Sequence, residues 1–265
     1  MTLKKIAGGI LMVVVALLAG WLPARADWTW EQTELTTLEL GATVKTLSQG
    51  SATYTVKSNL VRLDDVARGG CQIINFENRQ FLLINFQTKA FILFPLDEMI
   101  KSNLDDRAAI KGDLDNKAAE AAGLPGEQGR LMAAQVQAQR KKYQLWERPY
   151  TVRKTAETAT VANHPCSKFE GLSGEEVFQE LWVAEDLPLP PEFQGFFSVG
   201  MVQLDPQQYS HFLKLPGFPM KVINHYGPVT VTIEVVKVSN AVVTVDAFLI
   251  PPDFRESDNK VSPGN

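Results

Sequence analysis

Short apolar runs separated by turns dominate the first third of the chain beyond its N-terminal segment. Five such runs follow one another at residues 53–57, 60–63, 71–76, 81–86 and 90–94. Turn-forming stretches such as Gly69-Gly70 and Glu77-Asn78-Arg79 separate them. Strands of about five or six residues joined by turns of about three are typical of an antiparallel meander. The pattern therefore predicts consecutive antiparallel strands between Leu38 and Leu96.

Two of these strands, 81–84 and 91–94, do not alternate between apolar and polar residues. A strand with two apolar faces is covered on both sides, by core, by helices or by a ligand. We therefore expect this part of the sheet to be covered on both faces.

The composition changes over residues 98–147, where Ala, Gln, Lys, Arg and Glu prevail. These residues are strong helix formers, and Leu124-Pro125-Gly126 divides the segment in two. We therefore predict a helical hairpin inserted between strands. Its apolar positions are few, namely Leu131, Val136, Tyr143 and Trp146. Helices with so little to bury are expected at the surface, either as a loosely packed insertion or as a flap over a cavity.

Strand patterns resume after the predicted hairpin, at residues 150–161, 166–170, 177–184, 229–235 and 241–250. Within 229–235 every second residue is apolar, which predicts one buried and one polar face. Residues 193–215 are rich in Phe and predict irregular structure with a short helix. The order of elements predicts one α+β domain over 27–254, a curved antiparallel sheet with helices on one side. The polar tail 255–265 is expected to be disordered.

The N-terminal residues 1–26 have the three zones of a cleavable secretory signal. Lys4 and Lys5 precede an apolar run over 6–22, and Ala24-Arg25-Ala26 offers small residues at the cleavage site. A retained membrane anchor is the alternative, because a run of about 17 residues is at the short limit for crossing a bilayer. Cleavage predicts a soluble protein exported to the periplasm.

The charge of the chain is mildly acidic, with a formal net charge of −4. Loss of the signal peptide would remove three basic residues and no acidic one, leaving −7. Such a chain has no electrostatic footprint for nucleic acids or anionic membrane surfaces.

The two cysteines, Cys71 and Cys166, would both remain after cleavage. In an oxidising compartment two thiols suggest one disulfide, and two separately buried thiols are the alternative. No further cysteine and no Cys/His spacing indicates a metal site.

Catalytic motifs are missing from the pattern. His164, His211 and His225 are the three histidines, and none accompanies a nucleophile or zinc motif. Adjacent acidic pairs, such as Asp64-Asp65, point to opposite faces of a strand and are better explained as solvated turn charges. We therefore expect no enzymatic activity, no cofactor and no metal.

Apolar side chains exceed what a sheet with one buried face requires. Ordinary core is the alternative for any one of them, but as a set they suit a concave sheet that holds an elongated apolar ligand. The candidate lining residues are Phe81, Leu83, Phe91, Leu93, Trp182, Phe196, Phe197, Met201, Phe212, Val231 and Ile233.

Several segments between Val44 and Phe254 resemble the strand motifs of an exported family of unknown function related to the Lol-type periplasmic lipoprotein carriers (the LolA-like superfamily). They are residues 56–64, 73–76, 81–94, 161–169, 181–184, 217–220 and 248–251. The resemblance implies a half-open β-barrel closed by helices, an apolar cavity suited to acyl chains, and no catalysis.

Two functions remain open from the sequence. The first is a carrier or sensor that holds a lipid or a lipid-modified protein by its acyl chain. The second is an envelope protein that binds a protein partner through a sheet edge or the helices, with no lipid ligand.

Overall fold

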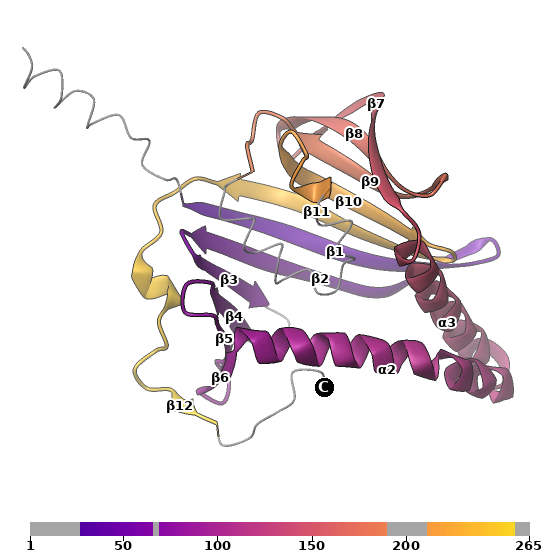
Figure 1. Ribbon diagram of the computed structural model, residues 1–265, viewed down its shortest axis with the longest axis horizontal. Coiled ribbons are helices and arrows are strands. Elements are labelled where there is room, and N and C mark those ends of the chain that lie inside the picture. Colours follow the sequence, from indigo (N-terminus) through magenta and orange to yellow (C-terminus); the bar gives the residue numbers. More distant parts are fainter. Residues whose placement is uncertain (1–26, 66–68, 190–210, 258–265) are drawn as a thin grey trace, which may run out of the picture.

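The computed structural model describes residues 27–65, 69–189 and 211–257 of the 265-residue chain. The predicted signal peptide, residues 1–26, lies outside the described residues. The described strands form one large, curved and unclosed sheet that arches over two long helices (Figure 1). A third, short helix follows the last long strand. This architecture agrees with the predicted α+β class and with the predicted curved antiparallel sheet.

The sheet contains twelve strands in the order β12-β6-β5-β4-β3-β2-β1-β11-β10-β9-β8-β7. Neighbouring strands are antiparallel, except that β12 runs parallel to β6. The strands are β1 Trp28–Leu40, β2 Thr43–Lys57, β3 Leu60–Asp65, β4 Gly70–Asn75, β5 Gln80–Asn85, β6 Ala90–Pro95, β7 Tyr150–Val161, β8 His164–Ser173, β9 Glu176–Ala184, β10 Phe218–Tyr226, β11 Val229–Ser239 and β12 Arg255–Glu256. The helices are α2 Leu96–Gly123, α3 Gly126–Trp146 and the 3-10 helix η2 Val245–Phe248.

Two turns of the same sequence type set the register of β4, β5 and β6. Both read Asn-Phe-x-x-Arg/Lys, at residues 75–79 and 85–89. In the first turn the Asn side-chain oxygen accepts a backbone N–H at 3.0 Å, and in the second it accepts two, at 2.9 and 3.0 Å. The closing residues Arg79 and Lys89 both adopt a positive φ, 50° and 51°. The repeated turn therefore fixes two successive hairpins.

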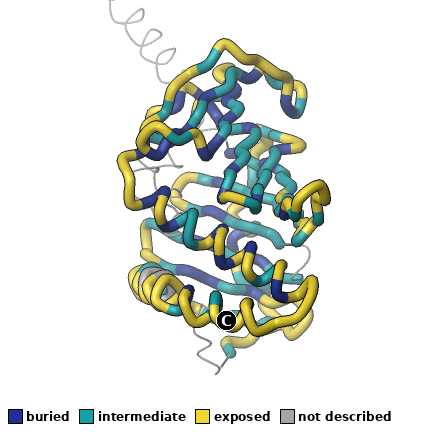
Figure 2. The backbone as a smooth tube through the Cα atoms, turned by 90° about the vertical axis from the view of Figure 1, so that its right-hand side faces the viewer, coloured by how far each residue is buried: buried dark blue, intermediate teal, exposed yellow. Residues whose placement is uncertain are grey.

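The face of the sheet that looks toward the helices carries two apolar cores. Trp30 and Leu38 are eight residues apart on β1, so they lie on this same face. The first core lies at one end of the strands, and its buried residues include Trp28, Trp30, Val61, Phe81, Leu96, Leu181, Phe212, Phe218 and Met220. The second core lies at the other end, beneath α3, and consists of Leu38, Ala134, Ala138, Leu145, Tyr150, Phe178, Tyr226 and Val229. Figure 2 shows buried backbone inside the arch and exposed backbone along its turns and helix surfaces.

The outer face of β3–β6 is covered by the C-terminal segment, which overturns the predicted strand over 241–250. Part of this segment forms η2, whose Phe248 packs on Cys71, Ile73, Leu82 and Ile84 in a third core. The Arg62 guanidinium donates to the carbonyl oxygen of residue 247 at 2.5 Å. Both faces of β5 are therefore covered, as the sequence predicts for 81–84, whereas Leu93 of β6, in the second strand of that prediction, is 40% exposed. The predicted disorder of the tail does not extend to residues 255–256, which form β12.

The predicted disulfide is wrong, because Cys71 and Cys166 both carry free thiols. Cys71 lies on β4 in the third core and Cys166 on β8 in the first core. Six strands stand between β4 and β8 in the sheet. Neighbouring strands are about 4.8 Å apart, whereas a disulfide requires Cα atoms within about 7 Å of each other. Burial raises the pKa of both thiols, to about 11 for Cys71.

We expect two titratable thiols per chain when the protein is unfolded without reductant and treated with a thiol-specific chromogenic reagent. In the folded protein the same reagent is expected to react slowly, because the thiols are buried and mostly protonated at neutral pH. Recovery of no thiol from the unfolded chain would contradict the observed strand order.

Candidate functional site

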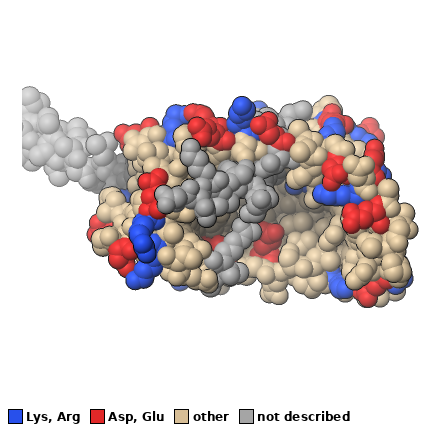
Figure 3. Space-filling model, turned by 90° about the horizontal axis from the view of Figure 1, so that it is seen from below, with Lys and Arg blue, Asp and Glu red and all other residues tan. Residues whose placement is uncertain are grey.

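A cleft of about 710 Å³ separates the two long helices from the concave face of the sheet. Its floor is formed by β1, β2, β10 and β11, and its wall by α2 and α3. The lining residues are Thr36, Leu47, Ser48, Ile110, Leu114, Lys117, Met132, Gln135, Val136, Ala138, Gln139, Lys142, Tyr226, Val229 and Val231. The face of the molecule seen in Figure 3 is visibly hollowed. A volume of this size falls within the range of pockets for small organic ligands, about 300–1,000 Å³.

The chemistry of the cleft is mostly apolar. Aliphatic residues of β11, namely Val229 and Val231, face Ile110 and Leu114 of α2 and Met132 of α3. The Ile110 side chain is 42% exposed, although it belongs to a large apolar residue type. The described residues that line the cleft include no carboxylate. An elongated apolar group could therefore enter without meeting a buried acidic charge.

Helix α3 is fixed to the sheet by small residues. Ala134 and Ala138 are buried against the strands together with Leu145, in the second core. The Ser173 hydroxyl of β8 donates to the carbonyl oxygen of Leu145 at 2.8 Å. Because two alanines allow close approach, α3 is anchored although it has few large apolar residues. The expectation of a loosely packed insertion is therefore wrong for α3.

Helix α2 is held at both ends. Leu96 and Met99, at its start, are buried in the first core. Further along, Leu114 packs with residues of α3 in a small cluster of its own, which contains Val136, Tyr143 and Trp146. Ion pairs link Asp115 with Arg140 and Lys111 with Glu147. Between these two anchors α2 crosses the open side of the arch (Figure 1).

The predicted lining residues do not form one surface. Of the described ones, only Val231 lines the cleft, and Ile233 follows it on the same face of β11. Phe81 and Phe212 are buried in the first core, and Leu83 packs against it. These three side chains fill solid core at the far end of the arch. Phe196, Phe197 and Met201 lie outside the described residues.

The other predicted lining residues point away from the cleft. Phe91 belongs to the third core, on the outer face, and Leu93 lies on that face too, 40% exposed. Trp182 pairs in register with Lys168, whose ammonium group lies 5.5 Å from the centre of the indole ring. Most of the predicted lining residues that are described therefore belong to the cores or to the outer surface, not to the cleft.

A family model named "Domain of unknown function (DUF4412)" matches residues 112–254 of the chain. The chain belongs to the DUF4412 family. The matched region contains the second half of α2, all of α3, and the neighbouring strands β7–β11. The DUF4412 region thus supplies α3, β10 and β11, which form much of the cleft, while β1 and β2 supply the rest of the floor.

No curated protein matches the chain. Solved structures that resemble it include PNGF-II, at 10% identity and a TM-score of 0.32, which covers 83% of this chain and 29% of that one. A second is the Pseudomonas aeruginosa MucA/MucB complex, at 10% identity and 0.34, covering 87% and 58%. A third is a putative outer membrane lipoprotein-sorting protein domain from Vibrio parahaemolyticus, at 8% identity and 0.29, covering 85% and 90%. The chain spans only part of the first two, and TM-scores this low support no argument about fold or function.

A buried polar row crosses the concave face of the DUF4412 region between the two cores. The Tyr150 hydroxyl donates to Gln179 Oε1 at 2.6 Å, and Gln179 Nε2 donates to Asn224 Oδ1 at 2.7 Å. Gln179 is only 1% exposed. Burial raises the pKa of Tyr150, so its hydroxyl stays a donor. The row therefore fixes three strands at the point where apolar packing is interrupted.

Replacement of Gln179 by Ala is expected to lower the free energy of unfolding by about 1–3 kcal/mol, because two buried polar partners are left unsatisfied. Urea denaturation followed by circular dichroism measures the change. The control Gln144→Ala, at an exposed position of α3, is expected to change stability by less than about 0.5 kcal/mol. Equal stabilities of the two variants would show that the row is not a stabilising element.

Acidic side chains share the concave face with Tyr54 of β2. The Tyr54 ring stacks on Trp30 with 4.6 Å between ring centres. Burial, and then the negative charges of Glu34 and Asp65, raise the pKa of Tyr54 to about 12. A neutral phenol is therefore favoured in the folded state.

We expect the ultraviolet difference spectrum between the native protein and Tyr54→Phe to show a phenol that ionises near pH 12. The stability contributed by this raised pKa is complete below about pH 10, the pKa of an unperturbed tyrosine, and is lost as the pH rises toward 12. A difference spectrum that titrates near pH 10 would mean that Tyr54 is solvated.

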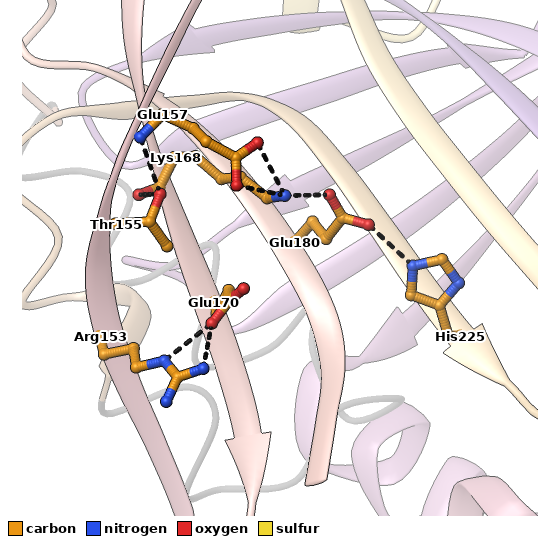
Figure 4. A network of polar contacts seen from close by, with 7 residues as sticks. All are labelled: Arg153, Thr155, Glu157, Lys168, Glu170, Glu180 and His225. Carbon is orange, nitrogen blue, oxygen red and sulfur yellow. Dashed lines mark hydrogen bonds and ion pairs between the residues drawn. The ribbon is translucent and has the colours of Figure 1, made fainter.

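An ion network ties β7–β10 together on the outer face (Figure 4). The Lys168 ammonium group lies 3.2 Å from a carboxylate oxygen of Glu157 and 2.9 Å from one of Glu180. The other carboxylate oxygen of Glu180 lies 3.0 Å from Nε2 of His225. Burial alone would raise the pKa of Glu180, but the bonds from Lys168 and His225 outweigh it and lower the net pKa. Hydrogen bonds of this kind hold neighbouring strands in register.

In the described part of the chain, no group of three His, Cys, Asp or Glu residues is placed to hold a metal ion. The described helices include none that is long and apolar enough to cross a membrane.

Proposed function

We propose that this chain is a periplasmic carrier or sensor of a lipid or a lipid-modified protein, and that one acyl chain occupies the cleft between the concave sheet and α2/α3. The observation that carries the proposal is the cleft itself, a mostly apolar space of about 710 Å³ lined by the concave face of the sheet and by α2 and α3. The predicted signal peptide and the predicted relationship to Lol-type carriers belong to the same proposal.

The energetics of such a site need no special polar chemistry. Burial of a methylene group contributes about 0.8 kcal/mol, so ten buried methylenes contribute about 8 kcal/mol before the cost of association is subtracted. Adaptable side chains such as Met132 and the half-exposed Ile110 suit chains of different length.

Native mass spectrometry of the protein purified without detergent tests the proposal. We expect part of the protein to carry an added mass that organic extraction identifies as a lipid. A protein that carries no lipid and binds no single-chain fluorescent fatty acid, but captures a stoichiometric protein partner, would overturn the proposal and favour the interaction module.

A bulky residue on the cleft floor should block the ligand. Val231→Trp places an indole in the cleft and is expected to weaken binding of a fluorescent single-chain fatty acid by about tenfold or more, a loss of about 1.4 kcal/mol or more. The neighbouring Thr232→Trp is the matched control, because adjacent strand residues point to opposite faces. Equal affinities of the two variants would place the ligand elsewhere.

Thermal unfolding shows whether each variant retains the fold. Met132→Trp offers a second obstruction from the helical wall, in case Val231→Trp disturbs the second core. The proposal requires that whichever of the two folds also binds the probe more weakly.

A further inference from the structure

The charged residues of the cleft are of one sign. Among the described residues that line it, the side chains charged at neutral pH are Lys117 of α2 and Lys142 of α3. The whole chain has a net charge of −4, so a lining with two positive and no negative charges departs from the rest of the molecule. This asymmetry favours an anionic group on the ligand.

Each lysine is placed beside the apolar part of the cleft. Lys117 follows Ile110 and Leu114 on one stripe of α2, at helical spacings of four and three residues. Its ammonium group lies 3.6 Å from Asp113, and both side chains are partly exposed. An exposed ion pair of this kind is weak, so Lys117 can bind a second anion at little cost.

Lys142 is partly buried beside two aromatic rings. Its ammonium group is 4.6 Å from the centre of the Trp146 ring and 5.8 Å from that of Tyr226. Tyr226 also lines the cleft and is buried in the second core. The rings of Trp146 and Tyr226 pack against the Lys142 side chain and keep its ammonium group at the cleft.

The carboxylates of the concave face lie outside the cleft lining. Glu34, which acts on Tyr54, is two residues from the lining residue Thr36 along β1. A negative group would therefore be repelled from that part of the sheet floor and attracted to the helical wall. The arrangement gives an amphipathic ligand one preferred orientation.

We propose that the ligand of this cleft is a single-chain amphiphile whose anionic end, a phosphate ester or a carboxylate, is bound by Lys117 and Lys142. This inference rests on the proposed function, because the lysines act on a ligand whose apolar chain occupies the same cleft. Lysine ammonium groups bind such anions as point charges, without the fixed geometry that arginine imposes.

The test compares headgroups at constant chain length. Isothermal titration calorimetry, below the micelle concentration of each probe, gives the affinities of tetradecanoate, myristoyl lysophosphatidylglycerol and myristoyl lysophosphatidylcholine. We expect at least one of the two anionic probes to bind about tenfold more tightly than the zwitterionic one. The probe that shows the preference tells a carboxylate from a phosphate ester.

The double variant Lys117→Gln with Lys142→Gln is expected to abolish this preference, because it weakens binding of the anionic probes more than binding of lysophosphatidylcholine, whose phosphate charge is already offset by its choline group. Lys142→Arg retains the charge and should retain the preference. The control Lys101→Gln with Lys214→Gln removes the same charge from exposed positions outside the cleft lining and should behave like the native protein.

The outcomes separate the two proposals. Equal binding of all three probes, unaffected by the lysine variants, overturns the headgroup assignment and leaves the acyl-chain cleft intact. Loss of preference in the control pair as well would mean a general charge effect and would also overturn it. Failure of every probe to bind overturns the proposed function together with this inference.

Discussion

The arrangement of this protein depends on how the concave face of a single curved sheet is covered. A sheet that is apolar on its inner side must bury that face against something else. Here the first core closes one end with the start of α2 and the segment 211–218, and the second core closes the other with α3. Between the cores the face is interrupted by the buried row of Tyr150, Gln179 and Asn224. The cleft exists because α2 crosses from the first core to the small cluster that it forms with α3, without filling the space between itself and the sheet.

The strands could be predicted where the chain repeats a local signal. The successive hairpins β4–β5–β6 follow from their short apolar runs and from Asn-rich turns, and the helices follow from composition. The structure of residues 241–250 was harder to predict from the sequence. An apolar segment that covers the outer face of a sheet has the same composition as a strand within the sheet. The anchoring of α3 could not be predicted, because it depends on the buried residues Ala134 and Ala138. Alanine is common on both buried and exposed helix faces, so the sequence pattern does not show which face is buried.

The candidate site was less predictable than the fold. Strands that are apolar on both faces give no indication of which face is hollow, so Phe81 and Phe91 were grouped although they lie on opposite sides of the sheet. Trp182 counts as surplus apolar surface in the sequence, but a tryptophan can also serve as a platform for a lysine. Val231 was found because strict alternation on β11 defines its face. The pairing of cysteines depends on strand order, which local patterns do not contain.

The helices are part of the core, and this affects how function can be studied. Removal of residues 98–147 would take away Leu145 and the alanines of the second core as well as the cleft wall. If such a deletion variant failed to bind a partner, the loss of binding could not be distinguished from loss of the fold. Point substitutions within the cleft are therefore more informative than removal of the whole segment.

The most direct measurement of the central claim is a set of isotope-filtered nuclear Overhauser effects between an unlabelled acyl chain and methyl-labelled protein. The account predicts contacts from the chain to the methyl groups of Ile110, Met132 and Val231, and none to those of Leu82 in the third core. Contacts confined to the outer face, or none to the three cleft residues, would contradict it.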